Sequence, residues 1–570
     1  MVSFCMLKRA LYGLLVSLLA WACSKEKKAV DLIVHHATIY SVDSAFAVYE
    51  AMSIRDGKVV EIGSNEAILG RYEASQEIDA KGRFIYPGFI DAHCHFTGYG
   101  LGLRQVDLTG TKSFDEVLHR TQDFAHREQI LPDGVERKLD GTSEMSWLVG
   151  RGWDQNDWSN PVFPERFRLD SLFPDRPVLL IRIDGHAALA NAKALELAGI
   201  TAKTSVTGGE IPLVQHAKKG LQPSGMLIDN AVDLVKAAIP PTEKKDLYAA
   251  LLNAQQNCFA AGLTTVDDAG VMYDEVEAMD ELQKAGKLKM RIYAMLSDSA
   301  PNYKRYLSRG PYKTDRLNVR SFKFYADGAL GSRGACLFRD YNDKAHWRGF
   351  LLSNMEHFRK YADMVDRGGF QMNTHCIGDS ALNMVMDIYI RHCNKKKDRR
   401  WRIEHAQVVA PDDVKSFSKD IIPSVQPTHA TSDMYWVEQR LGPDRLKYAY
   451  AYKELLNAAG TIALGTDFPV EDISAIKTFY AAVTRQDAKG YPPGGFQMEN
   501  ALDRKQALRG MTVWAAYANF EEKEKGSLEA GKFADFVILD TDLMNCKEHL
   551  ILKTKILQTY INGEQVFSSN

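Results

Sequence analysis

Short apolar runs recur through the middle of the sequence, and most of them end at a polar or ionisable residue that is followed by a helical pattern. Eight such strand–loop–helix units predict an α/β chain folded as a TIM-type (β/α)8 barrel, which carries its functional groups at the carboxyl ends of the strands. The alternative is an open doubly wound sheet, but no glycine-rich dinucleotide loop follows the first strand. The predicted strands end near His95, Asp268, Leu296, Asp327, His375, His405, His429 and Asp467.

The spacing of these ends also predicts an insertion. The first two ends lie 173 residues apart, whereas the later intervals are 24 to 48 residues long. One unit cannot fill the first interval, because a strand and a helix with their loops need only about 30 residues. We therefore expect a barrel over residues 87–519, with an insertion at about 98–240 that covers its mouth.

Both ends of the chain show strand patterns. Residues 29–77 alternate apolar and polar positions around an Asp56-Gly57 turn, and near the C-terminus the strand 534–539 precedes a hairpin with Asn562-Gly563 at its tip. Each segment is too small to bury a core alone. The simplest joint solution is one small β-sandwich made of residues 29–86 and 520–570.

The first 23 residues read as a targeting segment. Lys8 and Arg9 precede an apolar run over 10–22, which is too short to span a bilayer comfortably. The stretch from Ala20 to Cys23 resembles a bacterial lipoprotein cleavage box, although Trp21 is unusually large there. We expect a lipoprotein signal at 1–23, lipidation at Cys23 and an extracytoplasmic, membrane-anchored location; simple secretion and an uncleaved anchor are the alternatives.

The composition disfavours one class of function, the binding of nucleic acid. The 570 residues carry 71 Lys and Arg against 73 Asp and Glu, which disfavours a protein held on nucleic acid by phosphate contacts. The cysteines after Cys23 have no CxxC spacing and no disulfide-scaffold density, so they are expected to be mostly free thiols. They are Cys94, Cys258, Cys336, Cys376, Cys393 and Cys546.

The most specific chemical signal is His93-Cys94-His95. Residues two apart on a strand face the same way, so both imidazoles would point into the barrel while Cys94 points away. Two imidazoles can share one metal ion. The alternative is a pair of buried, hydrogen-bonded structural histidines.

Other ionisable residues are expected to converge on the same barrel face. His375 and His405 end later strands, and four convergent imidazoles favour a borderline metal such as zinc. Asp467 would join them from the eighth strand, as a ligand and as the base that takes a proton from water. A helix cap or a turn is the structural alternative for Asp467.

These motifs resemble the amidohydrolase superfamily, and within it amidohydrolase family 3, the branch similar to N-substituted formamide deformylases. The resemblance implies that Lys323, on the fourth strand, can react with carbon dioxide to give a carbamate that bridges two metals. A lysine paired with Asp327 and a solvent-facing lysine are the alternatives. The segments that carry the resemblance are 93–95, 150–154, 184–189, 323–333, His375, 404–407, 426–429, Asp467 and 526–535.

The insertion is expected to contain the residues that recognise the substrate. Trp153 and Asp154 offer aromatic and polar surface in a loop that could cap the pocket, although plain loop packing is an equal alternative. The resemblance implies that Asp184, His186 and His429 line the pocket, with His186 and His429 also assisting catalysis. Arg333 could hold a carbonyl or carboxylate through its planar fork, or it could form a surface ion pair.

The sequence thus predicts a metal-dependent hydrolase that cleaves a non-peptide amide or formamide-like carbon–nitrogen bond with metal-activated water, using one or two zinc or other divalent ions. The partner is a small amide-type substrate, with no nucleic acid, contact with the membrane only through a lipid anchor, and a homodimer as one option for assembly. A cyclic-amide hydrolase or deaminase would use the same site. A solute-binding lipoprotein without turnover is the alternative from another class.

Overall fold

The computed structural model describes residues 27–129, 147–218, 220–393 and 398–569. The expected signal segment 1–23 and the expected lipidation site Cys23 lie outside these residues. Within the described part of the chain, no helix combines the length and the apolar character that a membrane crossing requires.

Eight parallel strands form the central barrel, and each pairs with its neighbour in chain order. The ring is closed between its last and first strands by hydrogen bonds from the Asp467 N–H to the His93 carbonyl (2.7 Å) and from the His95 N–H to the Phe468 carbonyl (2.8 Å). The predicted TIM-type barrel is thereby confirmed. Its strands are β8 (Phe89–Cys94), β17 (Leu263–Val271), β18 (Arg291–Ser297), β20 (Leu317–Tyr325), β21 (Gln371–Cys376), β22 (Trp401–His405), β23 (Ile421–Val425) and β24 (Ala463–Leu464).

One predicted strand end differs. Strand β23 stops at Val425, and His429 lies one turn into the next helix, α14 (Pro427–Asp433). The reason is Pro427, because proline favours the first turn of a helix and cannot donate a hydrogen bond to a continuing strand.

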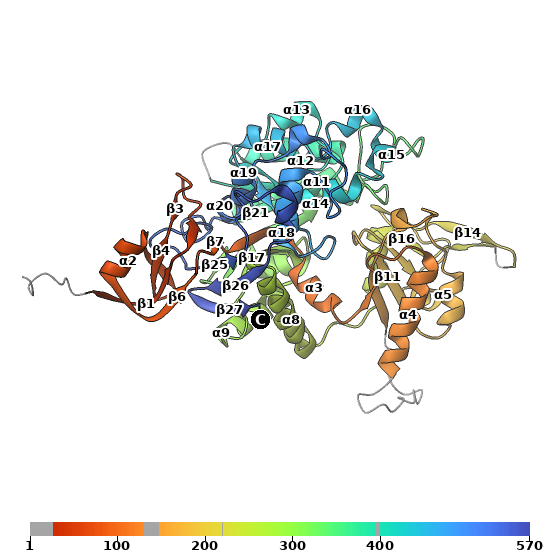
Figure 1. The fold of residues 1–570 in the computed structure, drawn as a ribbon. Helices are drawn as coiled ribbons and strands as arrows, with labels where there is room; N and C mark the ends of the chain where they lie inside the picture. The colour runs from red at the N-terminus through yellow and green to blue at the C-terminus, as the bar shows by residue number, and fades with distance from the viewer. Residues whose placement is uncertain (1–26, 130–146, 219, 394–397, 570) are drawn as a thin grey trace, which may run out of the picture.

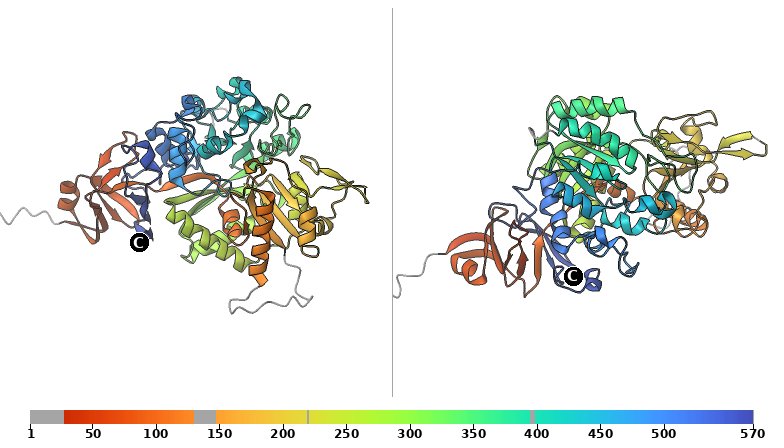
Figure 2. Two further views of the ribbon diagram at one scale, coloured as in Figure 1. Left: turned by 45° about the vertical axis from the view of Figure 1, so that its right-hand side comes forward. Right: turned by 90° about the horizontal axis from the view of Figure 1, so that it is seen from above.

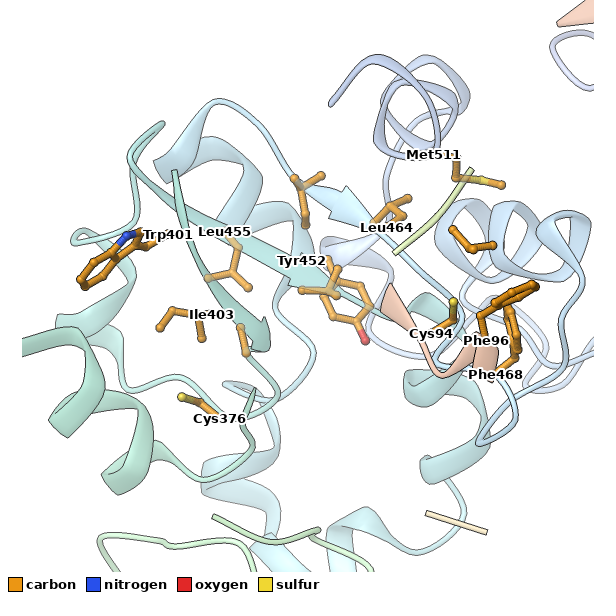
Figure 3. Close-up of a cluster of buried hydrophobic side chains, with 14 of the residues drawn as sticks. Cys94, Phe96, Cys376, Trp401, Ile403, Tyr452, Leu455, Leu464, Phe468 and Met511 are labelled. Atoms are coloured by element: carbon orange, nitrogen blue, oxygen red, sulfur yellow. The ribbon is translucent and has the colours of Figure 1, made fainter. Parts of the chain in front are cut away.

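Amphipathic helices cover the outside of the barrel. In α11 (Met355–Arg367) the buried Phe358, Ala362 and Val365 follow helical spacing, and the Asn354 side chain caps the first turn. Figure 3 shows how such apolar residues fill the space between strands and helices, with Cys94, Phe96 and Phe468 grouped together at one side. The other main helices are α3 (Phe96–Gly102), α8 (Lys244–Ala260), α9 (Tyr273–Lys284), α12 (Asp379–His392), α17 (Tyr452–Ala459) and α18 (Ala475–Thr484).

Two small sheets pack together at one side of the barrel (Figure 1). One has the order β5-β4-β1-β6 and the other β27-β26-β25-β7-β2-β3, so the second sheet joins strands from both ends of the chain. Their shared core includes Leu32, Ile54, Ile85 and Phe536. The strands are β1 (Lys28–His35), β2 (Thr38–Tyr40), β3 (Val48–Tyr49), β4 (Ala51–Arg55), β5 (Lys58–Gly63), β6 (Tyr72–Asp79), β7 (Phe84–Pro87), β25 (Phe536–Leu539), β26 (Ile556–Ile561) and β27 (Glu564–Ser568).

The segment between β8 and β17 builds a six-stranded sheet of its own, with the order β13-β16-β12-β11-β10-β9. Figures 1 and 2 place it on the opposite side of the barrel from the two small sheets. Its elements are β9 (Val106–Asp107), α4 (Phe114–Gln129), β10 (Leu148–Trp153), α5 (Phe167–Leu172), β11 (Val178–Arg182), β12 (Ala187–Ala190), α6 (Ala192–Leu197), β13 (Gly209–Glu210), the hairpin β14 (Leu213–His216) and β15 (Gly220–Pro223), β16 (Met226–Asp229) and α7 (Asn230–Lys236).

Candidate active site

The first barrel strand places two histidines at the barrel mouth. His93 and His95 flank Cys94, whose thiol instead packs in the hydrophobic core and donates to the Asp267 carbonyl at 3.4 Å. The two imidazoles come within reach of one carboxylate, because Asp467 Oδ1 lies 3.2 Å from His95 Nε2 and 3.7 Å from His93 Nε2. The alternation of a β-strand therefore brings both rings to one point.

Three of the imidazoles are oriented by contacts at Nδ1. His93 Nδ1 lies 2.6 Å from a Glu404 carboxylate oxygen, and His95 Nδ1 lies 2.9 Å from the Ala269 carbonyl. His405 Nδ1 lies 2.8 Å from the Gln426 side-chain oxygen. With Nδ1 engaged, each ring keeps Nε2 as the remaining nitrogen, which is how metal-ligating histidines are held by their outer partners.

His375 and His405 continue this cluster around the mouth. The ring centroids of His93 and His405 are 4.7 Å apart, and those of His405 and His375 are 4.6 Å apart. Burial, followed by the Lys323 charge, lowers the pKa of His93 to about 4. Burial also lowers the pKa of His375 and His405 well below the usual value. All three rings are thus neutral at pH 7, which is the form that binds metals.

Asp467 lies at the centre of the group. Burial raises its pKa, but the hydrogen bond with His95 and the electrostatic interaction with His93 and His405, which can take up protons only at lower pH, outweigh burial, and the net pKa lies well below the ordinary value. Its second oxygen lies 3.5 Å from His429 Nε2. Asp467 and His405 both have left-handed backbone conformations, with φ of 64° and 68°. Such conformations are costly for residues other than glycine, and the closed barrel holds them in place.

The donor set fits a divalent cation. His375 Nε2 and His429 Nε2 are buried atoms without a hydrogen-bond partner, and a bound ion would remove the free-energy cost of leaving them unpaired. Ligand atoms of His93, His95 and Asp467 lie within 4.8 Å of one another, and so do those of His405, His429 and Asp467. Imidazole and carboxylate donors of this kind suit zinc and related metals.

Lys323 is buried beside this cluster. Its Nζ lies 3.0 Å from His93 Nε2, and burial lowers its pKa to about 8. The structure disagrees with a solvent-facing lysine, since the side chain is fully buried. Lys323 is not paired with Asp327 either. The Asp327 carboxylate instead accepts hydrogen bonds from the backbone N–H groups of Cys336, Ile377 and Gly378.

A cavity of about 1240 Å³ opens between the barrel mouth and the insertion. The barrel contributes His95, Lys323, His375, His405, His429 and Asp467 to its lining. The insertion contributes Arg151, Asp154, Arg182, Asp184, His186 and Asp229.

The sequence profile of the Amidohydrolase family matches residues 76–567. This chain belongs to amidohydrolase family 3. Protein LONG AFTER FAR-RED 3 of Arabidopsis thaliana is 32% identical over 94% of this chain and 91% of that protein. The N-substituted formamide deformylase of Arthrobacter pascens is 25% identical over 94% of this chain and 97% of that enzyme. An uncharacterized metal-dependent hydrolase from Pyrococcus horikoshii OT3 superposes with a TM-score of 0.72 at 27% identity, over 91% of this chain and 99% of that structure.

His186 of the amidohydrolase extends from the insertion toward the histidine cluster. Its ring centroid lies 5.0 Å from that of His375, and its Nδ1 lies 2.6 Å from Asp229 Oδ1. Burial lowers the pKa of His186, but the Asp229 hydrogen bond and charge outweigh burial and the net pKa is raised. The contact with Asp229 therefore favours the protonated form of His186, in which Nδ1 is engaged by the Asp229 carboxylate.

Asp229 sits in a cradle made by the barrel. A Cβ on Gly328 or on Gly334 would come within 2.4 Å of the Asp229 carboxylate, so the two glycines provide the space for it. Asp229 also has φ of 51° and ψ of −122°, an unusual conformation that is costly for a residue with a side chain. The contact fixes the end of β16 against the loop after β20.

The expected substrate residues fall into two groups. Asp154 and Asp184 line the cavity, and both form ion pairs with the buried Arg182. Trp153 does not line the cavity; it packs against Trp158 with its Nε1 donating to the Leu180 carbonyl at 2.9 Å. Arg333 pairs with Asp343 at 2.8 Å outside the cavity lining. The structure thus favours packing for Trp153 and an ion pair for Arg333.

Sequence reasoning missed three residues of the site. Glu404 holds His93, Asp229 holds His186, and Arg151 lines the cavity. The signal for Glu404 was its place next to His405 on a predicted strand. Arg151 stood within a segment that carried the family resemblance, two residues before Trp153. Asp229 ends a strand of the insertion, where the sequence alone gave no sign of its partner.

Proposed function

We propose that this amidohydrolase hydrolyses a non-peptide carbon–nitrogen bond of the N-substituted formamide type. The observation that carries the proposal is the convergence of neutral imidazoles and an ionised carboxylate on one point, with buried atoms that lack partners. The relative from Arthrobacter pascens, named for formamide deformylation, supports the choice of substrate class.

In this proposal His93, His95, His375, His405, Asp467 and the carbamate form of Lys323 would hold one or two divalent ions, of which zinc suits the donors best. Such an ion lowers the pKa of water and polarises the amide carbonyl. The chain's own contribution is orientation, because Glu404, Gln426 and the Ala269 carbonyl fix three rings before any ligand binds.

Asp467 is the proposed base. Its low pKa keeps it ionised, and it therefore accepts the proton that attacking water gives up. The same carboxyl group then passes the proton to the leaving nitrogen, so that an acid and an amine are released. His429, 3.5 Å from the second oxygen of Asp467, lies on the side of the cavity where it can hold the substrate.

His186 is the proposed donor to the substrate carbonyl oxygen. Its raised pKa favours the protonated ring, and Asp229 occupies Nδ1, which leaves Nε2 for the substrate. A positioned donor of this kind stabilises the negative charge that develops on the oxygen as water adds to the carbonyl.

Lys323 is the proposed site of a carbamate. The neutral amine would attack carbon dioxide, form a nitrogen–carbon bond and release one proton, which gives an anionic ligand in place of a cation. The burial of Lys323 and its lowered pKa support this, because only the unprotonated amine is a nucleophile. Loss of activity in Lys323→Ala that short carboxylic acids restore would support the carbamate; failure of such rescue would count against it.

The experiment that tests the proposed function is a turnover screen with metal-loaded protein. Matched N-substituted formamides, cyclic amides and amino-substituted rings are supplied separately, and formate, ring-opened acid and ammonia are assayed. We expect formate plus amine from the first group. Ammonia alone would identify a deaminase, and tight binding without any product would identify a solute-binding protein.

The location of the enzyme is a separate proposal. The sequence around Cys23 supports a lipid-anchored protein on the extracytoplasmic side of a bacterial membrane. Replacement of Cys23 by Ser should release the protein from the membrane fraction, and a protein that stays bound would contradict the anchor.

A further inference from the structure

Arg151 is a half-buried cation that forms no ion pair with any of the described residues. It lies on β10 and lines the cavity. Its Nη2 donates to the Ile183 carbonyl at 3.1 Å, and its Nε is buried with no hydrogen-bond partner. Burial lowers the pKa of Arg151, yet arginine stays charged in proteins. A charged group whose Nε is buried without a partner has lost part of its hydration, so an anion from outside the chain would stabilise it.

The neighbouring arginine shows the usual solution. Arg182 ends β11, the strand that pairs with β10, and it is more deeply buried than Arg151, with 2% of its surface exposed. It forms ion pairs with Asp154 and Asp184, and its Nε donates to the Gln155 side chain at 2.8 Å. Among the described residues, the same sheet thus carries one guanidinium that is paired with two carboxylates, that of Arg182, and one that forms no ion pair, that of Arg151.

Arg151 and Gly185 both line the cavity, which places the guanidinium within reach of a ligand. Gly185 has φ of 77°, and a Cβ at that position would be in ordinary contact with Arg151 Nη2, at 3.4 Å. The other lining cations are occupied, because Lys236 pairs with Asp233 and Lys323 lies against His93. Arg151 is therefore the lining cation that is available to a ligand within the described residues.

We propose that Arg151 is the receptor for a carboxylate carried by the substrate, so that the hydrolysed amide belongs to the class of N-acyl amino acids and related amido acids. A guanidinium offers parallel N–H donors that match the two oxygens of a carboxylate. The proposal rests on the proposed function, since it names the substrate of the same site. Arg151 would fix the distal end of the substrate while the barrel mouth holds the amide.

The test uses metal-loaded protein and matched pairs, each an N-formyl amino acid and its uncharged C-terminal amide, with methionine and leucine as the first side chains. The variants are Arg151→Met and Arg151→Lys. The control is Arg168→Met, which removes an exposed arginine that pairs with Asp115 on the same insertion. Binding is also measured by calorimetry in Asp467→Asn, with and without Arg151→Met, so that affinity is read without turnover.

We expect wild type to prefer the acid over its amide by about 100-fold in kcat/KM, mostly through KM. Arg151→Met should remove most of that preference while the uncharged amide changes less than about threefold, and Arg168→Met should leave the preference intact. Calorimetry should show the same loss of preference. Absence of a preference in wild type, or equal losses for acid and amide in Arg151→Met, would overturn the proposal.

The two proposals fail in different ways. Turnover of uncharged formamides without any preference for acids would leave the hydrolase standing and overturn the carboxylate receptor. Preferential binding of acids that depends on Arg151, without turnover of any amide, would support the receptor and contradict the proposed hydrolysis.

Discussion

The barrel mouth and the insertion face each other across one cavity but handle charge in opposite ways. At the barrel mouth, burial lowers the pKa of His93, His375 and His405, which leaves neutral rings around an ionised Asp467. The insertion keeps its charges and balances them, as Arg182 does with two aspartates. The charges at the mouth are therefore balanced only with an added cation, whereas in the described part of the insertion Arg151 lines the cavity without an ion pair.

The strongest effect is expected from a change at the barrel mouth. Replacing Asp467 by Asn removes the proposed base but keeps an oxygen donor, so turnover should fall by about 10³- to 10⁴-fold while metal stays bound. Single-turnover kinetics and elemental analysis on the same preparation check this. A variant with wild-type rates would remove Asp467 from its role as base.

The second prediction compares the two arginines of the insertion. Arg182→Met leaves Asp154 and Asp184 buried without their cation, which should destabilise the protein by about 3–5 kcal/mol. Arg151→Met removes an unpaired charge and should leave the ligand-free protein at least as stable as wild type. Differential scanning calorimetry measures both. Equal destabilisation by the two substitutions would show that Arg151 has a structural partner.

The third prediction concerns orientation at the mouth. Glu404→Gln removes the charge that holds His93 Nδ1, and metal affinity should fall by about 10- to 100-fold. Competition with a chromogenic chelator measures the affinity. Glu438→Gln is the control, because Glu438 is an exposed glutamate. An unchanged affinity in Glu404→Gln would mean that His93 is oriented by other contacts.

A smaller effect is expected where the insertion meets the barrel. Asp229→Asn keeps the size of the side chain but removes the charge that favours protonated His186, so kcat should fall by about tenfold with metal content unchanged. Steady-state kinetics on a formamide substrate checks the rate. If the substitution affects KM alone, His186 serves binding and not the developing oxyanion.

The smallest effect concerns Trp153, which packs in the core of the insertion. Trp153→Phe removes the hydrogen bond to the Leu180 carbonyl and should cost about 1 kcal/mol of stability. Activity on any substrate should stay within about twofold, because the side chain does not line the cavity. A marked change in KM would instead place Trp153 in contact with substrate.

The barrel mouth could be predicted because strand ends obey simple rules. Parallel strands bring their carboxyl ends to one face, and alternation along β8 sets His93 and His95 against Cys94. Lys323 was expected near the site from the family resemblance, with a solvent-facing side chain as an alternative, and the structure buries it. What alternation did not reveal was Glu404, whose contact with His93 joins the sixth strand to the first, although these two strands are not neighbours in the barrel.

The insertion was harder to predict, and β10 shows why. Arg151 and Trp153 are two residues apart, so a regular strand would turn both to one face. The pairing of β10 with β11 shifts register between them, and Arg151 lines the cavity while Trp153 packs in the core. Such an irregularity re-aims a side chain, and the sequence pattern gives no warning of it.

Metal content tests the central claim most directly. Elemental analysis of protein purified without added metal should find about one or two divalent ions per chain, and His93→Ala with His95→Ala should lose most of them. Removal of the metal by a chelator should abolish turnover, and zinc should restore it. Full activity in protein with less than about one-tenth of an equivalent of any divalent metal would contradict the account.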